Sequence, residues 1–437
     1  MTINNSIFAP NTAEQLNATR FERIVKRIIV NFIFILFVAN QFPHTTTFKE
    51  ISFYGSLFLF LVLLCTQRVS IKIDSPLIPP ALAFIIIATI GSFWALNREN
   101  TLHDIYAHLL RYVILWVIMT SVLEKRRNVE LLITLIIAST TIFCLHSIVD
   151  LYVVKKLSIY TRLLTGAQEI TTNLLGIHTI LAINLAIYKL KSLKNGMVKI
   201  GFSLAIIILL LASFATQTRS TLGAIVLSIL IIFVVNQKWL KLIVILAVIG
   251  LIAVFSPEGK RLSNVNMTSN IRIQQIFLCL EVLKDHPLTG IGFGMQTFGQ
   301  DLDLAAYNKR VKAKYPLKKF PDSKLTNPHN LYTDIAVRTG VIGFFTFMVL
   351  IFTAYRLLLK TILAREKYYS DLALVNMASL SSFLFIAFFE PVFSHPFEVT
   401  LCLIFALVQL TYKKATAKKH RAYNSPPQEE GGKANGI

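Results

Sequence analysis

A short polar segment, Thr216 to Thr221, interrupts two long apolar runs and carries an arginine. Arg219 stands there among hydroxyl side chains and beside Gln217. A guanidinium in a turn this short is well suited to bind an anion, because it is always charged and can donate two parallel hydrogen bonds to phosphate. The alternative is an arginine at a helix end whose side chain only reaches toward water.

A second segment opens with Arg272 and leads into the sequence His-Pro-Leu-Thr-Gly-Ile-Gly-Phe-Gly at 286–294. Glycine at alternate positions permits tight turns and close approach of backbones. The spacing differs from that of a dinucleotide-binding loop, and no strand is predicted before it. Taken alone, an arginine at the start of a surface helix is better explained as a solvated side chain.

A third segment, residues 327–334, runs into another apolar stretch and contains His329. Imidazole titrates near neutral pH, so a histidine at the mouth of a helix is a natural general base. Asp334 and Arg338 are four residues apart and can pair on one helix face. A structural ion pair explains these two residues better than a catalytic role does, although Arg338 is also a candidate for substrate binding.

Composition indicates that membrane helices position these residues. The chain has 437 residues, of which 54% are hydrophobic and 15% charged, and its formal net charge is +21. A soluble fold cannot bury so much apolar surface, and a disordered chain would not carry it. These values exclude a soluble enzyme, a secreted disulfide scaffold and a DNA-binding domain, so no nucleic-acid partner is expected.

Apolar segments long enough to cross a bilayer recur along almost the whole chain. We therefore predict an all-α, polytopic integral membrane protein with about twelve transmembrane helices. The spans are expected near residues 25–42, 51–66, 77–96, 105–123, 129–154, 172–190, 199–216, 219–235, 239–256, 331–356, 372–390 and 396–412.

The distribution of Lys and Arg predicts the orientation. Basic residues gather at the N-terminus and in alternate connections, as in Lys125-Arg126-Arg127, and the positive-inside rule assigns these segments and both termini to the cytoplasm. The N-terminus lacks the pattern of a cleaved signal. The expected division is helices 1–9 in 1–256, a large periplasmic loop in 257–330, helices 10–12 in 331–412, and a basic, disordered cytoplasmic tail in 413–437.

The large loop contains two further features. Ile273, Ile276, Phe277, Leu280 and Leu283 recur at intervals of three and four residues, which predicts an amphipathic helix on the membrane surface or over a cavity. Farther on, basic residues alternate with aromatic ones and could bind anionic lipid phosphates, or could simply form a charged loop surface. The basic residues proposed for substrate binding are Lys309, Arg310 and Lys312.

The sequence predicts neither a metal nor another cofactor. The four cysteines show no disulfide framework and no metal-ligand spacing. Asp301 and Asp303 have the Asp-x-Asp spacing of metal-dependent nucleotide-sugar transferases. Their place in a loop outside the membrane, where nucleotide sugars are not available, makes a solvated loop surface the better explanation.

Together, the Thr-Gln-Thr-Arg turn, the Arg-initiated helix ending in Pro-x-x-Gly-x-Gly and the His-Asn segment leading to Arg-x-Gly resemble the O-antigen ligases. These are polytopic inner-membrane glycosyltransferases of Gram-negative bacteria. The resemblance covers the predicted architecture of the whole chain, while the matching motifs lie within about residues 210–345. The same superfamily contains O-antigen polymerases and protein O-oligosaccharyltransferases.

The resemblance implies metal-independent transfer of an O-antigen chain from undecaprenyl pyrophosphate to a sugar of the lipid A-core, on the periplasmic face of the inner membrane. It implies catalytic roles for Arg219, Arg272 and His329, and it suggests Arg162, in the segment 160–166, as a further member of the site. The expected partners are the lipid-linked donor, the lipid A-core acceptor and membrane lipids.

Two alternatives remain open from sequence. A polymerase of the same superfamily would use the same donor chemistry with a second lipid-linked unit as acceptor. A flippase or secondary transporter would also fit about twelve spans, but it predicts ionisable residues near the bilayer midplane and matching halves. The informative residues here gather on one predicted membrane face beside the large loop.

Overall fold

All regular secondary structure in the described residues is helical. The computed structural model describes residues 12–71, 74–163, 171–238, 243, 271–315, 327–390 and 395–424. The first group of helices is α1 (Thr12–Ala39), α2 (Thr46–Cys65), α3 (Ile78–Gly91), η1 (Ser92–Trp94), α4 (Arg98–Asp104), η2 (Ile105–Leu110), α5 (Arg111–Val122), α6 (Arg126–Ile148) and η3 (Val149–Val154). The second group is α7 (Thr172–Ser192), α8 (Gly196–Ala215), α9 (Arg219–Val235), α12 (Ile271–Asp285), α13 (Thr297–Gln300), α14 (Leu304–Lys314), α15 (Leu331–Leu363), α16 (Lys367–Ile386) and α17 (His395–Asn424).

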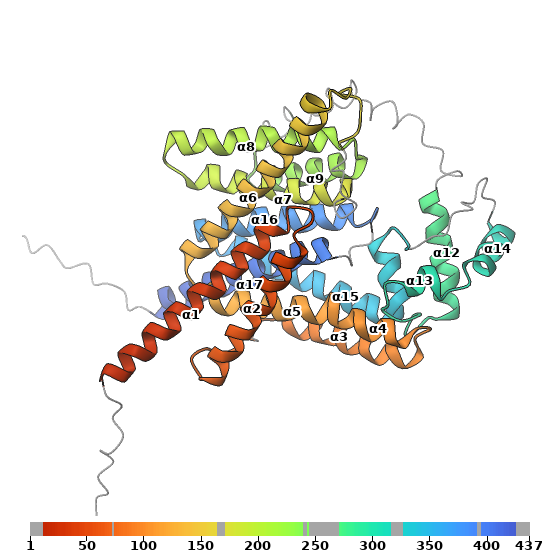
Figure 1. Cartoon of the computed structure of the whole chain (residues 1–437), viewed down its shortest axis with the longest axis horizontal. Coiled ribbons are helices and arrows are strands. Elements are labelled where there is room, and N and C mark those ends of the chain that lie inside the picture. The colour runs from red at the N-terminus through yellow and green to blue at the C-terminus, as the bar shows by residue number, and fades with distance from the viewer. Residues whose placement is uncertain are drawn as a thin grey trace, which may run out of the picture.

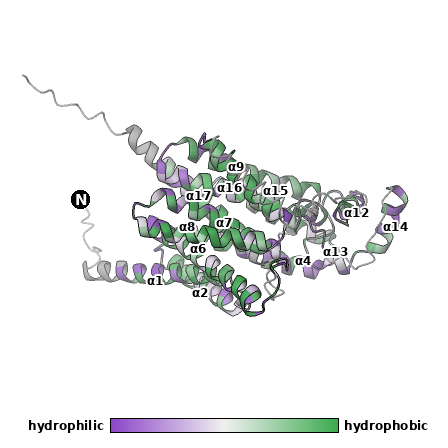
Figure 2. Ribbon diagram, turned by 90° about the horizontal axis from the view of Figure 1, so that it is seen from above, coloured by the Kyte–Doolittle hydropathy of each residue, from purple (hydrophilic) through white to green (hydrophobic). Residues whose placement is uncertain are grey.

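The long helices form an elongated bundle, and the short helices α12, α13 and α14 lie together at one end of it (Figure 1). The first turns of α1 lie at the opposite end. Hydrophobic residues dominate the middle of the bundle, as Figure 2 shows from a second direction. This arrangement places the large predicted loop and the start of the described chain at opposite ends.

The chain is a multi-pass membrane protein. Within the described residues, 8 helices are long and apolar enough to cross a membrane, and Ile78–Trp94 and Arg219–Val235 are shorter apolar helices. Each predicted span falls on a described helix, except that 239–256 lies almost entirely outside the described residues. The number of about twelve spans therefore stays a prediction.

Helix α7 is the centre of the bundle, with 89% of its most apolar window buried, whereas α8 is peripheral with 17%. Because lipid offers no hydrogen bonds, the polar residues of α7 must find partners inside the protein. Asn184 Nδ2 donates to Ser379 Oγ of α16 at 3.1 Å, and Ser213 Oγ of α8 donates to Thr179 Oγ1 at 2.9 Å. These bonds fix α7 against both neighbours.

A kink in α15 holds the glycine-rich segment that follows α12. Gly340 has a φ of +67°, which interrupts the helix and leaves nearby backbone groups available for other partners. Ile291 N donates to Val337 O at 2.9 Å, and Val341 N donates to Pro287 O at 2.8 Å. The close approach of backbones predicted for the alternating glycines is confirmed.

Arg338 and Asp334 of α15 also hold the glycine-rich segment in place. Arg338 Nε donates to Asp334 Oδ1 at 2.6 Å, which confirms the predicted pair. The remaining guanidinium nitrogens donate to the carbonyl oxygens of Gly294 and Met295. Asp104 Oδ2 accepts a hydrogen bond from Met295 N at 2.6 Å. The segment is therefore bound by both α4 and α15.

Helices α12 and α14 share a small apolar core with the segment between them and with α15. The predicted helix is present as α12, but its buried apolar face differs from the predicted one. Leu280 is 41% exposed, whereas Leu278, Cys279 and Val282 are buried. The reason is tertiary: α12 packs against Val311 of α14 and Val337 of α15, which spacing within one helix cannot reveal.

The C-terminal tail differs from the prediction. Helix α17 continues through Asn424, so the segment 413–424 is helical and not disordered. Lysine and alanine dominate 413–419, and both are good helix formers that can extend an existing helix into solvent. Residues 425–437 lie outside the described residues.

Candidate active site

The turn between α8 and α9 presents Arg219 to solvent. Helix α8 ends at Ala215, Gln217 adopts a left-handed φ of 50°, and Arg219 is the first residue of α9. The exposed side chain of Arg219 therefore stands beside the backbone N–H groups at the N-terminus of α9. Those groups and the helix dipole both favour an anion at this position.

Arg162 stabilises this turn from the neighbouring connection. Its Nε donates to Thr216 O at 2.7 Å, and its Nη2 donates to the hydroxyls of Thr172 and Thr218 at 2.7 and 3.0 Å. Gln217 Nε2 donates to Tyr160 O at 2.9 Å. The predicted segment 160–166 is described only through Leu163, and that part is fixed to the turn.

Three arginines from distant parts of the chain line one cavity of about 350 Å³. Arg272, near the start of α12, has its guanidinium carbon 5.3 Å from the ring centroid of Phe389, so the ring supports this cation from the α16 side. Among the described residues that line it, none is a carboxylate. Its residues are Arg162, Asn173, Gln217, Thr218, Arg219, Ser220, Arg272 and Phe389, and we call this space the arginine cavity.

His329 lies just before α15, as predicted. Asn330 caps that helix by accepting bonds from Tyr332 N and Thr333 N at 2.9 and 3.1 Å. His329 itself has a left-handed φ of 48°, and its side chain is 40% exposed. Its Nδ1 is 3.8 Å from Glu390 Oε2, which makes Glu390 an ion-pair partner when the imidazole is protonated.

Glu390 links His329 to the arginine cavity. Its Oε1 accepts a hydrogen bond from Asn173 Nδ2, and Asn173 Oδ1 accepts one from Ser220 Oγ at 2.8 Å. Asn173 and Ser220 both line the cavity. Sequence reasoning missed Glu390 and Asn173, although an acid directly after an apolar span satisfies the same criterion that selected His329.

Arg338 is placed apart from this group. Its side chain is 2% exposed and does not line the arginine cavity. Its guanidinium binds Asp334 and two backbone carbonyls, so the structure gives it a role in holding the loop. A direct contact between Arg338 and a substrate finds no support in this geometry.

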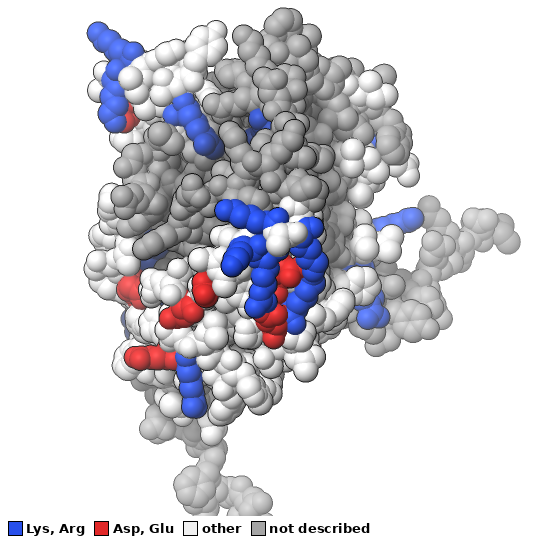
Figure 3. All heavy atoms as spheres, turned by 90° about the vertical axis from the view of Figure 1, so that its right-hand side faces the viewer, with Lys and Arg blue, Asp and Glu red and all other residues white. Residues whose placement is uncertain are grey.

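The basic residues of α14 also lie outside the cavity. Lysine and arginine side chains gather beside acidic ones on the end of the molecule that carries α12–α14 (Figure 3). Arg310 Nη1 is 2.6 Å from Asp285 Oδ2, while Lys309 and Lys312 are exposed on the same helix. Hydrogen bonds from Tyr307 and Arg310 lower the pKa of Asp285, so the carboxylate is ionised beside Arg310.

The two aspartates of the Asp-x-Asp sequence have structural partners. Asp303 Oδ1 accepts a bond from Ala306 N at 3.0 Å and so caps α14, and Asp301 Oδ1 accepts one from Asn97 Nδ2 at 3.4 Å. Across the described part of the chain, no group of three or more His, Cys, Asp or Glu side chains could hold a metal ion. The cap of α14 and the bond from Asn97 are the partners that the structure gives these two carboxylates.

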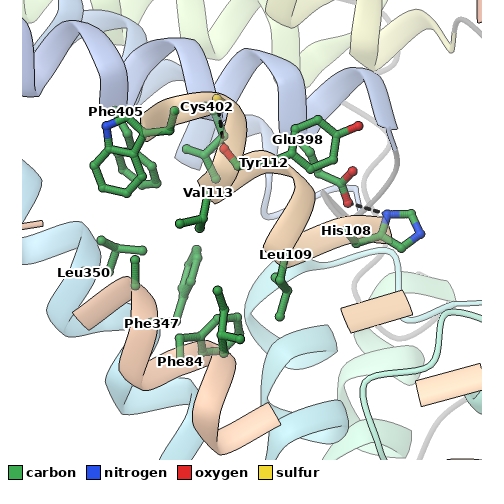
Figure 4. A pocket seen from close by; sticks show the side chains of 14 residues that line it. Phe84, His108, Leu109, Tyr112, Val113, Phe347, Leu350, Glu398, Cys402 and Phe405 are labelled. Atoms are coloured by element: carbon green, nitrogen blue, oxygen red, sulfur yellow. Dashed lines mark hydrogen bonds and ion pairs between the residues drawn. The ribbon is translucent and has the colours of Figure 1, made fainter. Parts of the chain in front are cut away.

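A second cavity, of about 70 Å³, is apolar and lies between α3, α5, α15 and α17. Figure 4 shows aromatic and aliphatic side chains around most of it, with His108 and Glu398 at one edge. His108 Nδ1 is 2.7 Å from Glu398 Oε1, and His108 Nε2 is 3.9 Å from Asp104 Oδ1. This polar group leads through Asp104 to the glycine-rich segment and not to the arginine cavity.

Comparison with known families identifies the segment that holds most of the site. Residues 204–348 match the family model described as O-antigen ligase. This part of the chain is similar to the O-antigen ligase family. The O-antigen ligase segment runs from α8 into α15 and confirms the resemblance seen in the motifs.

Similarity to this family indicates an enzyme of the glycosyltransferase type in general. The O-antigen ligase segment contains Gln217, Arg219, Arg272 and His329, while Arg162, Asn173 and Glu390 come from outside it. The arginine cavity is therefore assembled from the matched segment and from its surroundings. No match is found among curated proteins.

Proposed function

We propose that the protein is an O-antigen ligase, which transfers the polysaccharide from undecaprenyl pyrophosphate to a sugar hydroxyl of the lipid A-core. The observation that carries this proposal is the arginine cavity, where Arg162, Arg219 and Arg272 converge from distant parts of the chain. Such a site matches a pyrophosphate, which carries several negative charges and is already a good leaving group.

The pyrophosphate of the donor would lie in the arginine cavity. In the transfer, the bond between the anomeric carbon and the pyrophosphate oxygen breaks, and the departing oxygen takes the electron pair. Arginines stabilise that developing charge because their guanidinium groups are always positively charged and can donate parallel hydrogen bonds to phosphate oxygens. This stabilisation needs no metal ion, so we propose a metal-independent reaction.

The acceptor hydroxyl would be activated by His329. The hydroxyl oxygen attacks the anomeric carbon from the face opposite the pyrophosphate, and its proton passes to the imidazole. The result is inversion at the anomeric carbon in a single displacement. Glu390 lies on the Nδ1 side of His329, which leaves Nε2 as the nitrogen that takes the proton.

We propose that the arginine cavity faces the periplasm and that the described termini lie in the cytoplasm of the inner membrane. The distribution of Lys and Arg supports this orientation. The placement of α12–α14 opposite the start of α1 agrees with it, since the loop and the N-terminus would then lie on different sides (Figure 1).

The experiment is transfer by the purified full-length protein from a lipid-linked O-antigen to lipid A-core. We expect capped lipid A-core from the wild type and a loss of about 100-fold or more for Arg219→Ala, Arg272→Ala and His329→Ala, since each removes a charge-stabilising or proton-accepting group. Arg98→Ala is the matched control, because Arg98 packs on Phe93 of η1 outside the arginine cavity.

Two outcomes would contradict the proposal. Full activity of all three alanine variants would remove the arginine cavity and His329 from the chemistry. Wild-type protein that lengthens the lipid-linked chain but never caps lipid A-core would instead be an O-antigen polymerase.

A further inference from the structure

A second charged cavity lies on the other side of the bundle, between α1 and the connection from α5 to α6. Its volume is about 640 Å³, compared with about 350 Å³ for the arginine cavity. Nothing in the proposed transfer reaction uses it. The basic residues in its lining are Arg23, Lys26, Arg27, Lys125 and Arg127, and we call this space the basic cavity.

Positive charge dominates the lining. Five Lys or Arg side chains face two carboxylates, those of Glu22 and Glu124, which leaves a formal excess of three positive charges. Lys26 Nζ is 2.8 Å from Glu22 Oε1, so one of the carboxylates is engaged by a cation of the same helix. The surplus charge must be balanced by counter-ions or by a bound anion.

The two walls change from charged to apolar in the same direction. Arg23, Arg27, Val30 and Phe34 follow one another at three- and four-residue intervals on α1, so they share one face of the helix. Val30 and Phe34 are only 5% and 9% exposed. On α6, Arg127 is followed one turn later by Leu131, so the cavity has a basic rim and an apolar floor.

This gradient fits an amphiphile better than a small soluble anion. A phosphodiester head group would meet the basic rim, and the first carbons of an acyl chain would meet the apolar floor. The position of the cavity also fits an anionic lipid. The charge pattern predicts that this end is cytoplasmic, and anionic lipids attract basic residues at that membrane surface.

Membrane orientation alone does not explain the cavity. The positive-inside rule requires a number of basic residues at this end, but it does not require them to converge on one hollow. Basic residues of the same end also lie outside the cavity: Lys189 Nζ is 2.5 Å from Glu130 Oε2, and Lys413 Nζ is 2.8 Å from Asp74 Oδ2.

We propose that the basic cavity binds the head group of an anionic phospholipid from the adjacent leaflet. The phosphodiester lies against Arg23, Arg27 and Arg127, and the start of an acyl chain lies against Leu131, which is 44% exposed. This site is independent of the transfer reaction and does not rest on the proposed function.

The test measures lipid retention by the full-length protein with native mass spectrometry, using phosphatidylglycerol and phosphatidylcholine of equal chain length. The wild type should retain phosphatidylglycerol at least about tenfold more strongly, because each basic residue near a charged surface contributes about 1 kcal/mol. The triple variant Arg23→Gln/Arg27→Gln/Arg127→Gln should lose this preference.

A matched triple variant, Lys191→Gln/Lys238→Gln/Lys413→Gln, removes the same charge at the same end outside the cavity and should keep the preference. The charge-conserving triple variant Arg23→Lys/Arg27→Lys/Arg127→Lys should also keep the preference for phosphatidylglycerol. It distinguishes the loss of charge in the glutamine variant from a folding defect. Equal retention of both lipids by the wild type would overturn the proposal. Displacement of phosphatidylglycerol by millimolar inorganic phosphate would also overturn it, because the site would then be one for a free anion.

Discussion

At the scale of single residues, the charged groups of the candidate site divide between two tasks. Arg162, Arg219 and Arg272 surround a space for an anion, while His329 and Glu390 lie where a proton can be accepted and the resulting charge stabilised. Arg219 and His329 could be predicted because an ionisable residue at the edge of an apolar span is energetically costly, whereas Arg162 and Arg272 are implied only by the resemblance to the O-antigen ligases. Glu390 could not be paired with His329 from sequence, since only the fold brings the end of α16 to the start of α15.

The geometry predicts that Glu390 acts through His329. Glu390→Gln should lower kcat by about 10- to 100-fold with little change in KM, because the imidazole loses its orienting carboxylate while the arginine cavity is intact. The decisive measurement is a double-mutant cycle. His329→Ala/Glu390→Gln should be no slower than His329→Ala alone.

Glu50→Gln is the control for this cycle, since Glu50 pairs with Arg111 at 2.8 Å away from the arginine cavity. It should leave kcat unchanged. Independent, additive losses from His329→Ala and Glu390→Gln would show that Glu390 does not work through the histidine.

At the scale of elements, α15 organises both the site and the loop. Its first turn follows His329, and the backbone around its kink at Gly340 forms hydrogen bonds with the segment after α12. The sequence predicts a helix here because of its apolar length, and the glycines predict close backbone approach. The partner of those glycines is a long-range feature, because residues 287–292 meet residues 337–341 only once the chain has folded.

Gly340→Ala should destabilise the protein, because Gly340 has a φ of +67° and an added Cβ would overlap the Leu288 carbonyl. The expected cost is about 1 to 3 kcal/mol, seen as a lower Tm of the purified protein. Gly201→Ala is the matched control, since its added Cβ meets nothing within 4 Å on α8. It should leave Tm unchanged or raise it slightly, because alanine favours a helix over glycine.

The contact between α12 and α14 should weaken in acid. Tyr307 and Arg310 lower the pKa of Asp285 below its usual value of 3.8. A carboxyl group whose pKa is lowered by folding contributes stability above its unfolded pKa, and this contribution is lost as the pH falls through the folded value. Amide hydrogen exchange in α14, corrected for the intrinsic dependence on pH, should therefore accelerate as the pH falls below about 4.

Asp285→Asn should reduce this acceleration, leaving the part that comes from the pair of Glu281 with Lys314 of α14, and should give faster exchange already at neutral pH. Asp301→Asn, on the same end of the molecule, should preserve the wild-type dependence. If wild type and Asp285→Asn lost protection in parallel, the ion pair with Arg310 would not be what holds α14.

At the scale of the whole molecule, the net charge of +21 is divided between the two ends of the bundle. At the α1 end, basic residues line the basic cavity or pair with carboxylates. At the other end, three arginines form the candidate site, and the basic residues of α14 lie partly paired beside α12. Hydropathy could therefore predict the class of protein, and the charge pattern predicts an orientation for it. They could not predict the two cavities, because each is assembled from helices far apart in sequence.

This division of charge makes a topology prediction that single cysteines can test in a background lacking the four native ones. Cysteine at Asp301, in the α12–α14 region, should react with a membrane-impermeant maleimide added to intact cells made permeable only at the outer membrane. Cysteine at Lys413, near the end of α17, should react only after the inner membrane is opened, because the basic end is held in the cytoplasm. Labelling of both positions in intact cells would mean that the reagent had crossed the inner membrane. Cysteine at Lys191, which lies at the same end as Lys413, is the control for such leakage. Labelling of position 413 but not 301 would reverse the orientation and place the arginine cavity on the cytoplasmic side, where a ligase of lipid A-core could not meet its acceptor.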